Sequence, residues 1–139
     1  MAAAPLFIDS GGFYALVAPA NQAHGRAVKF MEEASRTRQR MLTTDYVLDE
    51  TATLLCARGL SKLLAQFFRL TEESHALTIE WVSPNRFSAA RKFMLKHLDQ
   101  KFSFTDCVSF IVMKELRLTD ALATDDHFRI AGFSPLLAE

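Results

Sequence analysis

Short apolar runs alternate along the chain with longer amphipathic stretches. The short runs predict buried strands, at residues 6–8, 41–44, 77–82, 121–123 and 133–137. The longer stretches repeat apolar residues three and four positions apart, which predicts helices at 13–17, 22–38, 46–57, 61–73, 84–97 and 105–116. Strands that alternate with helices are typical of an α/β fold with a mostly parallel central sheet.

Local residue types set the expected borders of these elements. Gly11 and Gly12 predict a turn between the first strand and the first helix. Asn21 and Asp45 are expected to cap the two helices that follow them. Pro135 lacks a backbone N–H, so the last strand is expected at an edge of the sheet.

Composition then narrows the class of protein. A length of 139 residues predicts a single domain over 1–139, and a half-hydrophobic composition gives ample material for a core. The formal net charge is zero, which argues against a general nucleic-acid binder but leaves room for a local basic patch.

The cysteines and the N-terminal residues bear on the cellular compartment. Cys56 and Cys107 make neither a disulfide framework nor a zinc site, which fits the reducing cytoplasm. Residues 1–5 contain no basic region and no long apolar run, so no signal peptide is expected. No uncharged stretch approaches the ~20 residues that span a bilayer.

Acidic residues follow the predicted strands in a way that points to a site. In open α/β sheets, ligands bind beyond the carboxyl ends of the strands. Asp9 and Asp126 each come after a strand, Glu50 lies in the first two turns of the helix after the second strand, and Asp106 lies in the first turn of its helix. We expect these four acids at one edge of the sheet, with Asp125 as the alternative to Asp126.

Each acid taken alone also has an ordinary structural interpretation. Asp9 suits a turn or a helix cap, and Asp106 lies three residues after Ser103, the spacing of a capping box. The helical phase turns Glu50, rather than Asp49, toward the edge of the sheet. A lone histidine beside a helix start, as His127 is, most often serves as a cap or a surface residue.

The four acids together favour a bound metal. Carboxylates gathered at one edge repel each other unless a cation neutralises them. Oxygen ligands suit Mg²⁺ or Mn²⁺ rather than zinc. We therefore expect a divalent metal held by Asp9, Glu50, Asp106 and Asp126.

Four segments share their order and spacing with a known family: Phe7-Ile8-Asp9-Ser10, Asp49-Glu50, Ser103-Phe104-Thr105-Asp106 and Ala123-Thr124-Asp125-Asp126-His127-Phe128. In them the chain resembles the PIN-domain nucleases, and above all the toxin ribonucleases of VapBC-type toxin–antitoxin pairs, over essentially its whole length. The resemblance implies a three-layer α/β/α sandwich, Mg²⁺- or Mn²⁺-dependent hydrolysis of RNA, a homodimer and a protein antitoxin as partner. It assigns the family's four catalytic acids to Asp9, Glu50, Asp106 and Asp126, the last being two residues after Thr124.

The expected chemistry is metal-assisted hydrolysis of a phosphodiester. Asp9 and Asp106 are expected as direct ligands, while Glu50 and Asp126 bind a second ion or orient water. Ser10, Thr105 and Thr124 lie beside the acids in sequence and are expected to hydrogen-bond the ligands.

RNA would also need basic contacts to its phosphates. Arg36, Arg38 and Arg40 alternate before the second strand and are the first candidates. Further candidates are scattered along the chain: Arg26, Lys29, Arg58, Lys62, Lys96 and Lys101.

Other activities stay open at this point. A structure-specific DNA nuclease or a housekeeping RNA-processing nuclease uses similar parts, whereas a non-catalytic binding module is disfavoured because all four acids are present. A dehalogenase-type phosphatase needs an acid two residues after Asp9, where Gly11 stands. The RNA target, the antitoxin, the number of metal ions and the oligomeric state are not fixed by the sequence.

Overall fold

The computed structural model describes residues 4–139, so the interpretation of residues 1–5 falls partly outside the described residues. Within them lies a parallel sheet in the order β3-β2-β1-β4-β5. Its strands are β1 (Leu6–Ile8), β2 (Met41–Thr44), β3 (Leu77–Glu80), β4 (Asp120–Leu122) and β5 (Ser134–Pro135). The predicted α/β class with a parallel sheet is confirmed, and β5 lies at an edge as Pro135 predicted.

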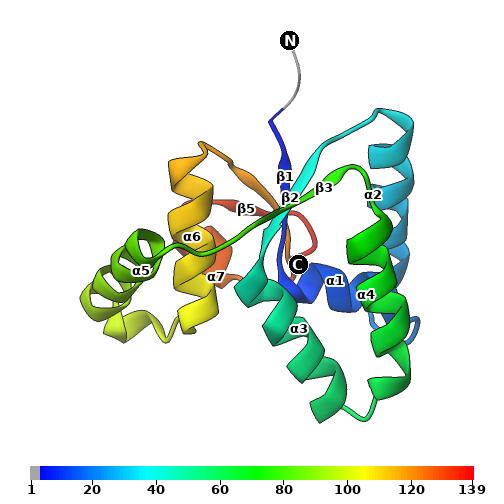
Figure 1. Cartoon of the computed structure of the whole chain (residues 1–139), viewed down its shortest axis with the longest axis horizontal. Coiled ribbons are helices and arrows are strands. Elements are labelled where there is room, and N and C mark those ends of the chain that lie inside the picture. The colour runs from blue at the N-terminus through cyan, green and yellow to red at the C-terminus, as the bar shows by residue number, and fades with distance from the viewer. Residues whose placement is uncertain (1–3) are drawn as a thin grey trace.

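Helices cover both faces of the sheet (Figure 1). One layer holds α1 (Ser10–Val17), α2 (His24–Arg36) and α4 (Leu64–Glu73), and the other holds α5 (Pro84–Lys96), α6 (Phe104–Glu115) and α7 (His127–Ile130). Helix α3 (Asp45–Ala57) contacts both α1 and α6. Short 3₁₀ turns, η1 (Ser61–Leu63) and η2 (Leu98–Gln100), precede α4 and α6. This is the expected α/β/α sandwich. Among residues 4–139, the helices are all too short or too polar to cross a membrane.

The two adjacent glycines lie in the first turn of α1 and do not form the predicted turn. A Cβ atom on Gly12 would lie 2.1 Å from the backbone oxygen of Leu122, and one on Gly11 would lie 2.4 Å from Oγ1 of Thr124. The glycines therefore allow α1 to begin against the end of β4. The Gly11-Gly12 pair is thus explained by the close approach of the α1 backbone to the end of β4.

Two helix caps also differ from expectation. Asn21 does not cap α2, which begins at His24 with Ala23 at its N-cap position, and Asn21 Oδ1 instead accepts a 2.8 Å hydrogen bond from the Ala23 amide. Thr44, rather than Asp45, caps α3, since its Oγ1 accepts a hydrogen bond of 3.1 Å from the Val47 amide. Asp45 instead accepts a 3.0 Å hydrogen bond from the Val82 amide, which ties the end of β3 to the start of α3. The capping box at α6 is present as predicted, with Ser103 and Asp106 each accepting from the other's amide.

Candidate active site at the carboxyl ends of β1 and β4

The acids gather where the strand order reverses direction. Strand β1 pairs with β2 on one side and with β4 on the other, so the segments that leave these strands diverge at this point. Asp9 directly follows β1, and Asp125 follows β4 by three residues. The first two turns of α3 and the first turn of α6 bring Glu50 and Asp106 to the same place. This is the position where open α/β sheets bind ligands.

Asp9 lies at the centre of the cluster and is only 4% exposed. Burial, the charge of Asp106 and the charges of Glu50 and Asp125 raise the pKa of Asp9 to about 8, although a hydrogen bond from the Ser10 backbone opposes the shift. Its buried Oδ1 finds no hydrogen-bond partner within residues 4–139. A buried carboxylate oxygen without a donor is costly unless a cation accompanies it.

Asp106 serves both the fold and the site. Its side chain closes the capping box of α6, and it is 6% exposed. The same oxygen that accepts from Ser103, Oδ2, also lies 3.0 Å from Nδ1 of His127. The structural and the functional interpretations of this residue are therefore compatible.

Glu50 is held in place by a neighbour that the sequence singled out. Ser10 Oγ donates a hydrogen bond of 2.5 Å to Glu50 Oε1, across the junction of α1 and α3. Glu50 is half-buried whereas Asp49 is exposed, as the helical phase predicted. Thr124 packs with its hydroxyl against Gly11, and Thr105 is half-buried in the first turn of α6.

The second of the two adjacent aspartates does not join the cluster. Asp126 precedes α7, its side chain is 63% exposed, and it forms an ion pair with Arg129 one turn further on. Asp125 lies instead with Asp106 and His127, and ligand atoms of these three residues are within 4.8 Å of one another. Asp125, the alternative to Asp126, is thus the aspartate that the structure brings to the cluster, because the start of α7 turns Asp126 outward.

His127 is the site residue that sequence reasoning missed. Its Nδ1 lies 3.0 Å from Asp106 Oδ2 and 3.4 Å from Asp125 Oδ2, and its ring packs edge-on against Phe102. Its position beside a helix start alone predicts a cap or a surface residue. Its sequence position could have indicated a role in the site, because it follows Asp125 by two residues and lies beyond a strand that ends at the same edge of the sheet as β1.

The three arginines expected to contact RNA lie at the end of the sheet opposite the acids. Arg40 precedes β2, and its backbone oxygen accepts from the Leu6 amide at the start of β1. Arg36 pairs with Glu33. In a parallel sheet, a loop that enters a strand lies opposite the loops that leave one, so the segment before β2, with Arg36, Arg38 and Arg40, lies at the other end of the sheet from the acids. Lys101 is better placed, since it precedes the cap of α6 by two residues.

The residues of the cluster fit a divalent cation. Asp106, Asp125 and His127 offer carboxylate oxygens and one imidazole nitrogen. The unpartnered oxygen of Asp9 is buried nearby, where the charges of Asp106, Glu50 and Asp125 act on it. Such a donor set suits a hard ion that prefers oxygen. The arrangement is therefore able to hold a metal.

Known proteins share this fold over nearly the whole chain. A 23S rRNA-specific endonuclease, VapC20, from two strains of Mycobacterium tuberculosis is 29% identical over 130 residues, which cover 92% of this chain and 95% of that protein. The crystal structure of M. tuberculosis VapC20, described as a sarcin–ricin loop cleaving toxin, superposes with a TM-score of 0.83 and 26% identity. That superposition covers 94% of this chain and 98% of the other. Protein-family profiles give no match.

Proposed function

We propose that this chain, which is similar to VapC20 in sequence and fold, is a PIN-domain protein of the VapC type, a metal-dependent endoribonuclease and the toxin of a toxin–antitoxin pair. The observation that supports this best is the buried, unpartnered oxygen of Asp9 among three further acids. If the protein needed this residue only for its fold, replacing the buried carboxylate by an uncharged side chain would increase its stability. The single domain is proposed to span 1–139.

We propose Mg²⁺ or Mn²⁺ as the cofactor, held by Asp9, Asp106 and Asp125. When bound, the ion lowers the pKa of water and stabilises negative charge on the phosphate. Ser10 fixes the carboxylate of Glu50, so Glu50 is suited to orient the attacking water. His127 holds Asp106 against the β4–α7 connection and so keeps two of the ligands together.

The proposed substrate is structured RNA with an exposed loop. VapC20 is described as an endonuclease specific for 23S rRNA and as a toxin that cleaves the sarcin–ricin loop. For this chain we propose the same class, an RNA hairpin of the ribosome, and accordingly a cytoplasmic place of action. A protein antitoxin and a second copy of the chain are the proposed protein partners.

Cleavage of matched hairpins tests the choice of nucleic acid. The wild-type chain is incubated in Mg²⁺ with a sarcin–ricin-type RNA hairpin and with a DNA hairpin of the same sequence. Cleavage of the RNA alone, inside the loop, is the expected result. Preferential cleavage of the DNA would replace the proposed function by that of a DNA nuclease, and cleavage of neither would remove the ribosomal hairpin as the substrate.

A further inference from the structure

Trp81 is the single tryptophan of the chain, and it directly follows β3 with 69% of its surface exposed. Tryptophan is among the costliest side chains to leave in water, because its ring offers a large apolar area. Single exposed apolar side chains are common on protein surfaces, so the position of the indole relative to the acids decides what it can do.

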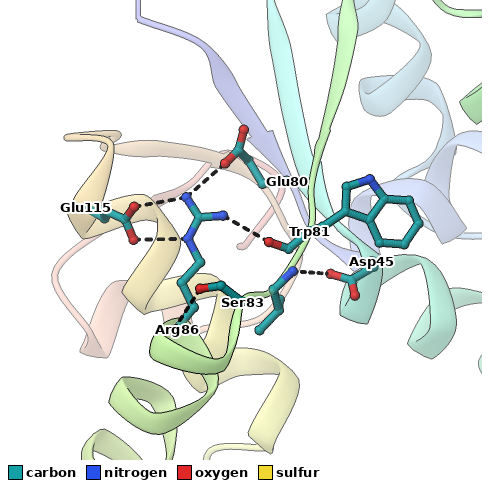
Figure 2. Close-up of polar contacts among 7 residues, drawn as sticks. Asp45, Glu80, Trp81, Ser83, Arg86 and Glu115 are labelled. Atoms are coloured by element: carbon teal, nitrogen blue, oxygen red, sulfur yellow. Dashed lines mark hydrogen bonds and ion pairs between the residues drawn. The ribbon is translucent and has the colours of Figure 1, made fainter.

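The backbone around Trp81 is held firmly by polar contacts (Figure 2). Arg86 Nη1 donates to the Trp81 carbonyl at 3.3 Å, and its Nη2 pairs with Glu80 at 2.8 Å and with Glu115 at 3.0 Å. On the other side, the Val82 amide donates to Asp45. Figure 2 shows the indole pointing away from the guanidinium. The ring is thus exposed but fixed at its base, so a ligand that stacks on it loses little chain entropy.

Trp81 lies on the same edge of the sheet as the acids. Glu80 pairs with Thr44, and the β1–β2 register of Phe7 with Leu42 places Asp9 level with Thr44. Two interstrand spacings therefore separate the backbone at Glu80 from that at Asp9, or about 10 Å. An RNA strand with a phosphate at the acids passes within reach of the indole.

The neighbours of Trp81 favour a nucleobase over a protein surface. Glu80, Ser83 and Asp45 surround its backbone, and two of these residues are already engaged in the contacts above. The buried centre of a protein–protein interface is depleted of charged residues, whereas an unpaired RNA base stacks on a single exposed aromatic ring.

We propose that Trp81 is a base-stacking residue that receives an unpaired RNA base while the phosphodiester lies at the acid cluster. The inference rests on the proposed function for its ligand. Such a contact would select a loop over a duplex, because paired bases are not available for stacking.

The emission of the single tryptophan gives a direct test. The full-length chain is titrated in EDTA with an RNA hairpin carrying a purine-rich loop, and separately with a fully paired RNA of equal length; fluorescence anisotropy of labelled RNA measures binding in parallel. Indole emission is expected to change and saturate with the hairpin and to stay nearly constant with the duplex. Binding in EDTA needs no cleavage, so this result is independent of whether the RNA is cut.

Substitutions complete the experiment. Trp81→Ala is expected to weaken hairpin binding by about 5- to 150-fold, the range for loss of one base–aromatic stack, while Trp81→Phe keeps most of the affinity. Leu95→Ala, at another exposed apolar side chain, is the matched control and should change little. Constant emission while the hairpin binds, or unchanged affinity in Trp81→Ala, would overturn the proposal. Emission that shifts with protein concentration alone would also overturn it, by assigning Trp81 to contact between copies of the chain.

Discussion

Nδ1 of His127 lies 3.0 Å from Oδ2 of Asp106, which joins the segment after β4 to the first turn of α6. The same nitrogen lies 3.4 Å from Asp125 Oδ2. One imidazole therefore sets the separation between two of the proposed metal ligands. Mutation of a residue that orients metal ligands commonly lowers metal affinity by about 10–100-fold.

His127→Ala is accordingly expected to raise the Mg²⁺ concentration needed for half-maximal RNA cleavage by about tenfold or more. Stability should fall by only about 1 kcal/mol, since the imidazole is partly exposed. A magnesium titration of the cleavage rate, beside a thermal melt, measures both quantities. An unchanged magnesium requirement would show that His127 does not position the ligands.

The adjacent aspartates provide a matched pair of variants. Asp125→Asn should reduce cleavage at least about 100-fold, because it removes a charged ligand from the cluster. Asp126→Asn should stay within about threefold of the wild-type rate and lose at most ~1 kcal/mol of stability, the typical worth of an exposed ion pair. Rates measured at saturating Mg²⁺ decide between them. The reverse ranking would restore Asp126 as the fourth acid.

The raised pKa of Asp9 predicts how stability depends on pH without metal. The unfolded carboxyl titrates near 3.8, whereas burial and the neighbouring acids raise the folded pKa to about 8. The folded state therefore keeps a proton that the unfolded state releases, and stability falls as the pH rises from about 4 to 8. Chemical denaturation in EDTA across this range measures the slope.

Asp9→Asn serves as the control for this pH dependence, because asparagine has no proton to release. The variant should show a smaller loss of stability between about pH 4 and 8 than the wild type. Mg²⁺ should stabilise the wild type more at pH 8 than at pH 6, since the ion competes with the proton for the carboxylate. Parallel slopes for the two proteins would mean that Asp9 titrates normally.

The two glycines of α1 give a prediction about the fold around the site. Gly12→Ala should destabilise the protein by several kcal/mol, because the new Cβ would meet the Leu122 backbone oxygen at 2.1 Å. Gly25→Ala, in the first turn of α2, has nothing within 4 Å of its added Cβ and should leave stability equal or slightly higher. Urea denaturation of both variants tests the contrast. Equal stabilities would show that α1 can move away from β4.

Much of the site was predictable because strand ends and helical phase are local properties. The apolar run before Asp9 located it at the end of a strand, and the phase of the helix separated Glu50 from Asp49. The choice between Asp125 and Asp126 depended on where α7 begins, which is settled by packing between distant segments. The spacing of two residues from Thr124 points to Asp126, but it does not show where α7 begins.

The position of the basic residues could not be predicted for a related reason. Arg36, Arg38 and Arg40 form the densest basic run, but charge density does not tell which end of a parallel sheet a loop occupies. Their position before the second strand does tell this, because a loop that enters a strand lies at the end opposite the acids. The Ser10–Glu50 contact, by comparison, agrees with a prediction from sequence adjacency to Asp9, since the first turn of α1 meets α3 at that point.

The central claim, metal-dependent cleavage of RNA at the Asp9 cluster, is tested most directly by single-turnover cleavage of the RNA hairpin. The wild-type chain and the folded Asp9→Asn variant are assayed in excess EDTA and again after Mn²⁺ is restored. The account predicts no cleavage by either protein in EDTA, recovery in Mn²⁺ for the wild type, and no recovery for the variant. Undiminished cleavage in excess chelator, or recovery by Asp9→Asn to the wild-type rate, would contradict it.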